Sequence, residues 1–162
     1  MISVGIDPGK SGAIVALEDD DSVLLCEDMP TLPVDKSKKD YNVPEMSRML
    51  SELMGGDAQI FVVLERSQAM PKQGVTSTFK IGMGYGIWLG ILGSLHTPYV
   101  TVRPAEWAKV ILKGQPGKGK ERSLGLVSGR LPNLPLVPDG CRAPRDGRAD
   151  AACLALYGRR LL

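Results

Sequence analysis

The sequence predicts an α/β fold, a mixed five-stranded sheet flanked by helices, in a single domain of residues 1–162. Three observations carry this prediction. Short apolar runs typical of strands come first, strands and helices then alternate, and a chain of this length can bury one core of sheet and helices. With 43% hydrophobic and 23% charged residues, the composition is that of a folded globular protein.

The strands are predicted from alternating or continuous apolar runs. The first alternates Ile2, Val4 and Ile6 with small or polar residues and breaks at Pro8 and Gly9. An acidic tip joins the next two, which indicates an antiparallel meander. The fourth is a continuous apolar run, the pattern of a strand covered on both faces. The predicted strands cover residues 2–7, 12–18, 22–28, 59–64 and 99–102.

The helices are predicted from apolar side chains that recur at helical spacing, and the loops from proline, glycine and lysine. The predicted helices cover residues 43–54, 77–95, 105–112, 121–131 and 146–160. The predicted loops cover residues 29–41, 113–120 and 132–144.

The composition also limits the class of protein. No apolar run is long enough to span a membrane and no signal peptide precedes the first strand, so a cytoplasmic protein without a membrane partner is expected. The three cysteines, which lack CxxC spacing, predict reduced thiols rather than disulfides or a zinc site. The single histidine, His96, has no second histidine with which to share a metal, so a structural role is expected.

Charge is distributed unevenly along the chain. Residues 1–60 carry 5 basic and 12 acidic side chains, whereas residues 61–162 carry 15 basic and 6 acidic ones. A basic surface beside an acidic site would attract a polyanion, although solvated lysines and arginines also account for such counts. The stretch from Arg103 to Arg122 is rich in basic side chains and is a candidate for phosphate contact or a solvated loop. Its basic residues are Arg103, Lys109, Lys113, Lys118, Lys120 and Arg122.

Four carboxylates lie where a sheet would gather them. Asp7 and Glu65 lie at the carboxyl ends of predicted strands, and the four-residue spacing of Asp146 and Asp150 puts both on one helix face. Clustered carboxylates raise one another's pKa unless a hard divalent cation neutralises them. Two Mg²⁺ ions about 4 Å apart could activate a water and stabilise the leaving oxygen of a phosphodiester. Singly, each carboxylate also fits a turn or a solvated surface position.

Residues 114–120 match the pattern GxxxxGK of a nucleotide-binding loop. The next residue is Glu121 rather than Ser or Thr, and no predicted strand directly precedes the loop. We therefore reject a P-loop and expect no nucleotide cofactor.

Four segments, taken in order, resemble the RuvC family of Holliday junction resolvases over nearly the whole chain, and phage members more than bacterial ones. They are GIDPGKSGAIV at 5–15, VVLERSQAMPKQG at 62–74, VRPAEWAKVIL at 102–112 and DGRADAACLAL at 146–156. The resemblance implies an RNase H-like fold and a homodimer that acts on branched DNA. It implies two Mg²⁺ ions per site, replaceable by Mn²⁺, and it makes Lys118 or Lys120 a candidate for stabilising charge at the scissile phosphate. The implied catalytic and metal-binding carboxylates are Asp7, Glu65, Asp146 and Asp150.

The chain departs from the family pattern at two places. The terminal acidic pair is four residues apart instead of three, which makes Asp150 a safer metal ligand than Asp146. Gln68 stands where bacterial members carry an aromatic residue that contacts unstacked bases, so weaker sequence preference is expected. The residues expected to contact DNA are Arg66, Gln68, Lys72, Lys80, Arg103, Lys109, Lys113, Lys118, Lys120 and Arg122.

A stripe of glycines marks the long helix predicted at 77–95. Glycine inside a helix is tolerated where another backbone packs closely, either the chain's own sheet or a second subunit. The resemblance implies the second subunit. The glycines expected at this dimer contact are Gly82, Gly86, Gly90 and Gly93.

The function implied by the resemblance is a metal-dependent endonuclease that resolves four-way junctions by paired symmetric nicks through metal-activated water. One alternative is a relaxed structure-specific nuclease that debranches forks and flaps. Another, from a different class, is an ATP-binding actin-like domain, which shares the RNase H-like core but needs two such domains. A DNA-binding protein without catalysis is a third, and the four carboxylates argue against it. RNA as a substrate remains open.

Overall fold

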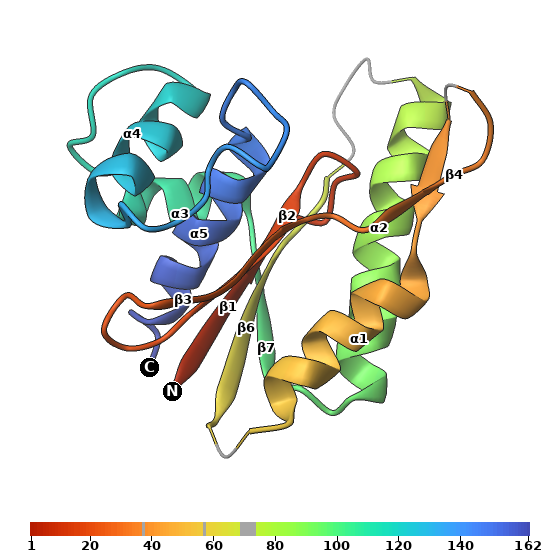
Figure 1. The fold of residues 1–162 in the computed structure, drawn as a ribbon, viewed down its shortest axis with the longest axis horizontal. Helices are drawn as coiled ribbons and strands as arrows, with labels where there is room; N and C mark the ends of the chain where they lie inside the picture. Colours follow the sequence, from red (N-terminus) through yellow and green to blue (C-terminus); the bar gives the residue numbers. More distant parts are fainter. Residues whose placement is uncertain (37, 57, 69–73) are drawn as a thin grey trace.

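The computed structural model describes residues 1–36, 38–56, 58–68 and 74–162. A five-stranded sheet in the order β3-β2-β1-β6-β7 lies between two layers of helices (Figure 1), so the predicted α/β architecture is confirmed. Its strands are β1 (Ile2–Ile6), β2 (Ala13–Leu17), β3 (Val23–Asp28), β6 (Ile60–Glu65) and β7 (Tyr99–Val102). The helices are α1 (Val43–Met54), α2 (Val75–Ser94), α3 (Pro104–Ile111), α4 (Lys120–Arg130) and α5 (Asp146–Gly158).

The pairing of the strands brings the carboxyl ends of three strands to one edge of the sheet. The central strand β1 is antiparallel to β2 and parallel to β6, and β6 is parallel to β7. The carboxyl ends of β1, β6 and β7 therefore meet at the same edge, where ligands bind in open α/β sheets. Ile6 pairs with Leu64 in the register of β1 and β6, so Asp7 and Glu65 follow side by side.

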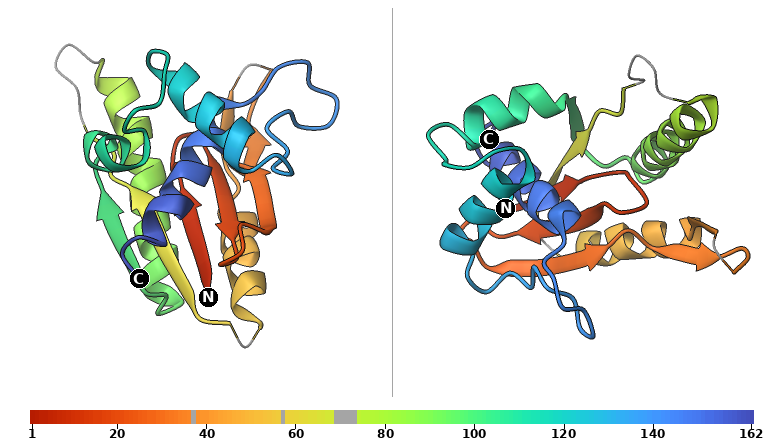
Figure 2. Two further views of the ribbon diagram at one scale, coloured as in Figure 1. Left: turned by 90° about the vertical axis from the view of Figure 1, so that its left-hand side faces the viewer. Right: turned by 90° about the horizontal axis from the view of Figure 1, so that it is seen from above.

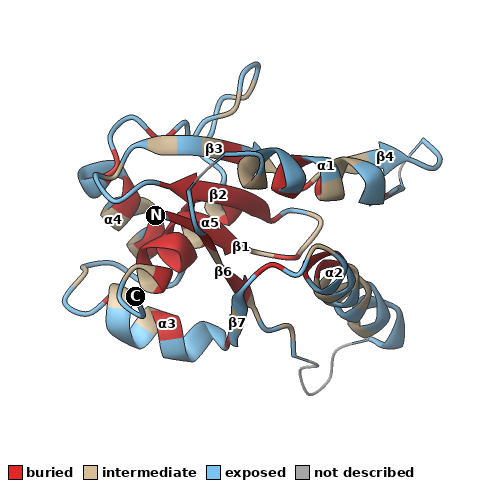
Figure 3. Cartoon of the chain, turned by 90° about the horizontal axis from the view of Figure 1, so that it is seen from below, coloured by how far each residue is buried: buried red, intermediate tan, exposed pale blue. Residues whose placement is uncertain are grey.

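The two faces of the sheet are covered by different helices. Helices α1 and α2 cover one face and α3, α4 and α5 the other, as the view from above in Figure 2 shows. Because side chains alternate along a strand, Ile2, Val4 and Ile6 all point to the α1 and α2 face. Ten of the 13 residues of α5 are buried, and the burial colours of Figure 3 place this helix at the centre of its layer.

Small residues let α5 lie directly on β1. A Cβ at Gly5 would overlap the carbonyl oxygen of Ala151, and one at Gly147 would overlap that of Ser11. Ser3 Oγ donates a 2.7 Å hydrogen bond to the Ala155 carbonyl across the same contact. The strand and the helix thus touch through backbone atoms, which fixes the position of α5 at the end of β1.

The segment 29–41 is not the predicted loop throughout. It contains a two-stranded antiparallel hairpin of β4 (Thr31–Pro33) and β5 (Lys39–Tyr41). Strands of three residues leave no room for an alternating apolar pattern, and proline and lysine gave the segment the composition of a loop. The buried side chain of Tyr41 anchors the hairpin to the domain.

The predictions on membrane, cysteine and histidine concern single features of this fold. Within the described ranges, no helix is both long and apolar enough to cross a bilayer. Cys26, Cys141 and Cys153 all lie in these ranges as free thiols, as predicted. His96 is exposed in the turn after α2, with a φ of 52°.

Candidate active site

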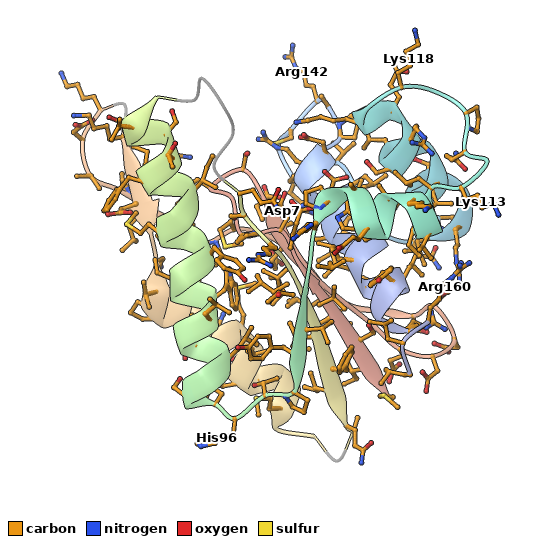
Figure 4. All side chains as sticks on the ribbon, turned by 180° about the vertical axis from the view of Figure 1, so that it is seen from behind. Asp7, His96, Lys113, Lys118, Arg142 and Arg160 are labelled. Carbon is orange, nitrogen blue, oxygen red and sulfur yellow. The ribbon has the colours of Figure 1, made fainter. Side chains whose placement is uncertain are left out.

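Three carboxylates from three elements meet at the carboxyl edge of the sheet. Asp7 follows β1, Glu65 ends β6, and Asp150 lies on α5. The charge of Asp150 raises the pKa of Asp7, and the charges of Asp7 and Asp150 both raise the pKa of Glu65, so the three face one another. Figure 4 shows Asp7 at this edge, between α2 and α3.

The turn after β1 determines how Asp7 is held. The Gly9 amide donates a 3.1 Å hydrogen bond to Asp7 Oδ1, and the Asp7 amide donates to the Ala13 carbonyl at 3.0 Å. A Cβ at Gly12 would lie 2.7 Å from Asp7 Cγ, so only glycine lets the chain pass this close. Burial raises the pKa of Asp7 to about 6, although the Gly9 hydrogen bond opposes the shift.

Glu65 is oriented by a tryptophan. Trp107 Nε1, from the buried side chain on α3, donates a 2.7 Å hydrogen bond to Glu65 Oε2. Burial is the main cause that raises the pKa of Glu65 to about 7, the charge of Asp7 adds to it, and the Trp107 bond opposes it. Trp107 was not among the residues predicted for the site, although a buried tryptophan usually needs a partner for its N–H group.

Asp150 faces the first turn of α4. Burial raises its pKa, whereas the Ser123 hydroxyl and the charge of Lys120 lower it. The same hydroxyl donates a 3.1 Å hydrogen bond to the Lys120 carbonyl, which places it in the first turn of the helix. Ser123 is a second neighbour that was not predicted, because no motif in the sequence marks it.

Asp146 forms an ion pair with a lysine of α4. It lies at the start of α5 and pairs with Lys120, the first residue of α4. Lys120 also lowers the pKa of Asp7 and Asp150, so its ammonium group belongs to the site. Lys118 instead points outward from its loop in Figure 4, and its amide donates to Glu121 Oε2 at 3.3 Å. The structure therefore separates the two lysines that the sequence left equivalent.

The donor chemistry of this site suits a hard divalent cation. Asp7, Glu65 and Asp150 offer carboxylate oxygens, which Mg²⁺ prefers, and their mutual repulsion would be relieved by a bound cation. In the part of the chain that the structure describes, no three His, Cys, Asp or Glu side chains are gathered tightly enough to enclose one ion. The oxygens are thus of the right kind, but cation binding would require the carboxylates to draw closer.

The residues predicted to contact DNA fall into several places. Arg66, Gln68 and Arg103 are exposed at the carboxylate edge, and Lys80 is exposed on α2. Lys109 and Lys113 are exposed on α3 and just after it. Lys72 lies outside the described residues.

Arg122 is directed inward instead. Its guanidinium donates to the carbonyls of Gln115, at 3.3 Å, and of Leu112. Arg122 thus ties the glycine- and lysine-rich loop to α4.

The four glycines predicted at a helix contact are not covered by the chain's own sheet. Gly82, Gly86, Gly90 and Gly93 are exposed, and no described atom lies within 4 Å of a Cβ added at any of them. Val75 and Phe79 extend the same stripe of α2 and are 87% and 71% exposed. We call these six residues the glycine face. The glycine that packs intramolecularly is Gly84, where a Cβ would overlap the Pro8 carbonyl.

Tyr41 connects the β4–β5 hairpin to the turn that carries Asp7. Its hydroxyl donates a 3.0 Å hydrogen bond to the Pro8 carbonyl. Lys10 Nζ lies 5.2 Å from the centroid of the Tyr41 ring and 3.2 Å from Asp40 Oδ1. This connection could not be predicted from the sequence, because the residues come from segments about 30 positions apart.

Comparisons with known proteins identify the fold. No family model matches the chain, and no curated protein is significantly similar to it. Thermus thermophilus RuvC matches with 22% identity over 99% of this chain and 96% of its own, at a TM-score of 0.64. The same protein in complex with a Holliday junction substrate matches with 22% identity at 0.67, over 99% of this chain and 96% of its own.

A third solved structure, the yeast mitochondrial Holliday junction resolvase Ydc2, matches with 17% identity at a TM-score of 0.53. The match covers 97% of this chain and 77% of the Ydc2 chain. The chain is therefore structurally similar to Holliday junction resolvases over nearly its whole length, and its fold is the RNase H-like fold of RuvC.

Proposed function

We propose that this protein is a divalent-cation-dependent endonuclease that hydrolyses phosphodiester bonds in four-way branched DNA. The observation that carries the proposal is the meeting of Asp7, Glu65 and Asp150, three half-buried carboxylates with raised pKa values, at the carboxyl edge of the sheet. The choice of DNA follows from the likeness to RuvC, of which one solved structure is a complex with a Holliday junction substrate.

Each side chain of the site has a part in this proposal. The Gly9 amide and Trp107 hold the oxygens of Asp7 and Glu65 in place, and Asp150 approaches them from α5. With Mg²⁺ or Mn²⁺ bound to these oxygens, two ions per site, the cations would lower the pKa of a water and offset the charge of the leaving oxygen. The Lys120 ammonium faces the same space and would stabilise charge on the scissile phosphate. Asp146 holds Lys120 and would have to release it before binding a cation itself.

The proposal includes a homodimer formed through the glycine face of α2. This face is uncovered in the single chain and carries two exposed apolar side chains, Val75 and Phe79. A two-fold dimer would present two equivalent sites to a nearly two-fold-symmetric junction and so make paired symmetric nicks. Gly86→Leu should overpack the contact, convert paired nicks on a cruciform plasmid into single ones, and shift the sedimentation coefficient toward the monomer. A monomeric wild type that makes paired nicks in one binding event would contradict the dimer.

The experiment that tests the nuclease incubates the protein with labelled four-way, forked, flap and linear DNA, with and without Mg²⁺. Cleavage of the four-way substrate should require the cation. Asp7→Asn, Glu65→Gln and Asp150→Asn should each lower the cleavage rate by a factor of about 100 or more, the scale of a lost electrostatic contact in catalysis, while DNA binding persists.

Arg160→Gln is the matched control, since Figure 4 places this exposed residue far from Asp7. Equal cleavage of forks and flaps would replace junction resolution by relaxed debranching. Full activity of the Asp7 and Glu65 variants would reject the site.

A further inference from the structure

A hollow on the surface begins beside the turn that carries Asp7. It lies between the β4–β5 hairpin and the amino-terminal half of α2, which Figure 1 shows next to each other. Its inner part, about 340 Å³, is lined by Gly9, two residues after Asp7, and its outer part is about 570 Å³. Lys10 and Lys80 line both parts, so the two parts adjoin and the hollow extends outward from the turn that carries Asp7.

The lining of this hollow is basic. Four lysines and a single acidic side chain, Asp40, contribute to it; we call the hollow the lysine groove, and its lysines are Lys10, Lys38, Lys39 and Lys80. Asp40 pairs with Lys10 at 3.2 Å, whereas the exposed Lys39 and Lys80 have no ion-pair partner among the residues described. Phe79 of the glycine face borders the outer part, so the groove runs beside the proposed dimer contact.

The groove is also fixed relative to the turn that carries Asp7. The Tyr41 hydroxyl of the hairpin donates to the Pro8 carbonyl of the turn at 3.0 Å. The Lys10 ammonium of the turn donates in return to the Asp40 carboxylate of the hairpin. Both contacts join the hairpin to residues 7–10. A ligand held along the groove would therefore be positioned with respect to Asp7.

We infer that the lysine groove binds the sugar–phosphate backbone of one arm of the nucleic-acid substrate as it leaves the carboxylate site. Unpaired lysines along a hollow neutralise phosphates without reading sequence. The identity of the strand rests on the proposed nuclease function. The groove itself rests on the charge and the continuity of its lining.

The test measures binding without cleavage. A fluorescent four-way junction is titrated with the full-length protein in EDTA at several salt concentrations, and anisotropy gives the affinity. The variant Lys39→Gln/Lys80→Gln should bind about tenfold more weakly at low salt, and its dependence of log affinity on log salt should be shallower by about 2 units. The control Arg130→Gln/Arg160→Gln removes two positive charges elsewhere and should bind within about twofold of the wild type.

The outcomes separate the groove from the nuclease. Wild-type affinity and salt dependence in the Lys39/Lys80 variant overturn the groove, while loss of cleavage in Asp7→Asn leaves the nuclease standing. A changed sedimentation coefficient in the Lys39/Lys80 variant overturns the inference in favour of a contact between copies of the chain. If the wild type never cleaves but the variant loses binding as stated, the groove stands and the nuclease does not. A wild type that binds no DNA overturns both.

Discussion

The two faces of the central sheet are packed by different kinds of side chain. On the α1 and α2 face the core is built from large residues, which include Met46, Met49, Leu50, Trp88, Ile91 and Leu92. On the α5 face the helix contributes mainly alanine and glycine, which include Gly147, Ala149, Ala151, Ala152, Ala155 and Gly158.

The difference shows which two elements of the molecule are held at a fixed distance from each other. Large unbranched side chains such as methionine adapt their rotamers, so the α1 and α2 face can absorb small changes of shape. Backbone atoms cannot move aside in this way, and a contact made by glycine against backbone fixes the distance between two elements. Helix α5 carries Asp150 to the carboxylate site, and it contacts β1 through glycine and backbone atoms, while leucines and Trp107 fill the rest of the same layer.

The strongest test of this comparison places a methyl group between α5 and β1. Gly5→Ala would push its Cβ into the Ala151 carbonyl, so we expect a loss of about 3 kcal/mol or more in the free energy of unfolding, measured by urea denaturation. Cleavage should fall as well, because Asp150 moves with α5.

The control is a glycine with free space around it. Gly129 on α4 is exposed, with no described atom within 4 Å of an added Cβ, so Gly129→Ala should raise stability by up to about 1 kcal/mol. Equal effects of the two substitutions would show that the contact between α5 and β1 has room for a methyl group and does not fix their distance.

The next test uses pH, because the three carboxylates lie where α5 meets the carboxyl edge of the sheet. The pKa values of Asp7 and Glu65 rise from 3.8 and 4.5 to about 6 and about 7 in the folded chain. Between about pH 4 and pH 7 the folded protein therefore holds protons that the unfolded chain has released. Without divalent cations, stability should fall by a few kcal/mol as the pH rises through this window, as thermal denaturation in EDTA would show.

Two further measurements sharpen the pH test. Asp7→Asn should flatten the fall and raise the melting temperature at pH 8 in EDTA, because it removes one buried charge. Added Mg²⁺ should stabilise the wild type at pH 8 more than it stabilises this variant. Stability that rises with pH across the window would mean that the carboxylates are not coupled as described.

The smallest expected effect concerns the hydrogen bond from the Tyr41 hydroxyl to the Pro8 carbonyl, in the turn that carries Asp7. Tyr41→Phe leaves the Pro8 carbonyl without its donor, which should cost about 1 kcal/mol in chemical denaturation. Because Pro8 follows Asp7, the cleavage rate should fall more than the affinity for DNA. Tyr99→Phe, at a tyrosine 40% exposed, is the matched control. An unchanged stability of Tyr41→Phe would remove the connection between hairpin and turn.

The sequence predicted two kinds of feature. One is an element whose apolar residues recur at a regular spacing, and the other is a residue whose place follows from the order of the elements along the chain. Alternating apolar residues located β1, and the carboxylates that follow β1 and β6 could be expected at one edge of a sheet. The hairpin escaped prediction because its strands have three residues each, too few for periodicity. Trp107, Ser123 and Tyr41 escaped because each contacts a residue distant along the chain, and a single sequence contains no signal for such pairs.

The contact of Trp107 with Glu65 has a spectroscopic consequence. The chain contains two tryptophans, one in the core of each face of the sheet. Trp88 is buried, and its Nε1 finds no partner in the described structure, whereas the Nε1 of Trp107 bonds directly to a carboxylate of the site. Fluorescence of a Trp88→Phe variant would therefore come from Trp107 alone. Its emission would follow the protonation of Glu65 and the arrival of a cation without any label, and so convert a structural hydrogen bond into an optical reporter of the site.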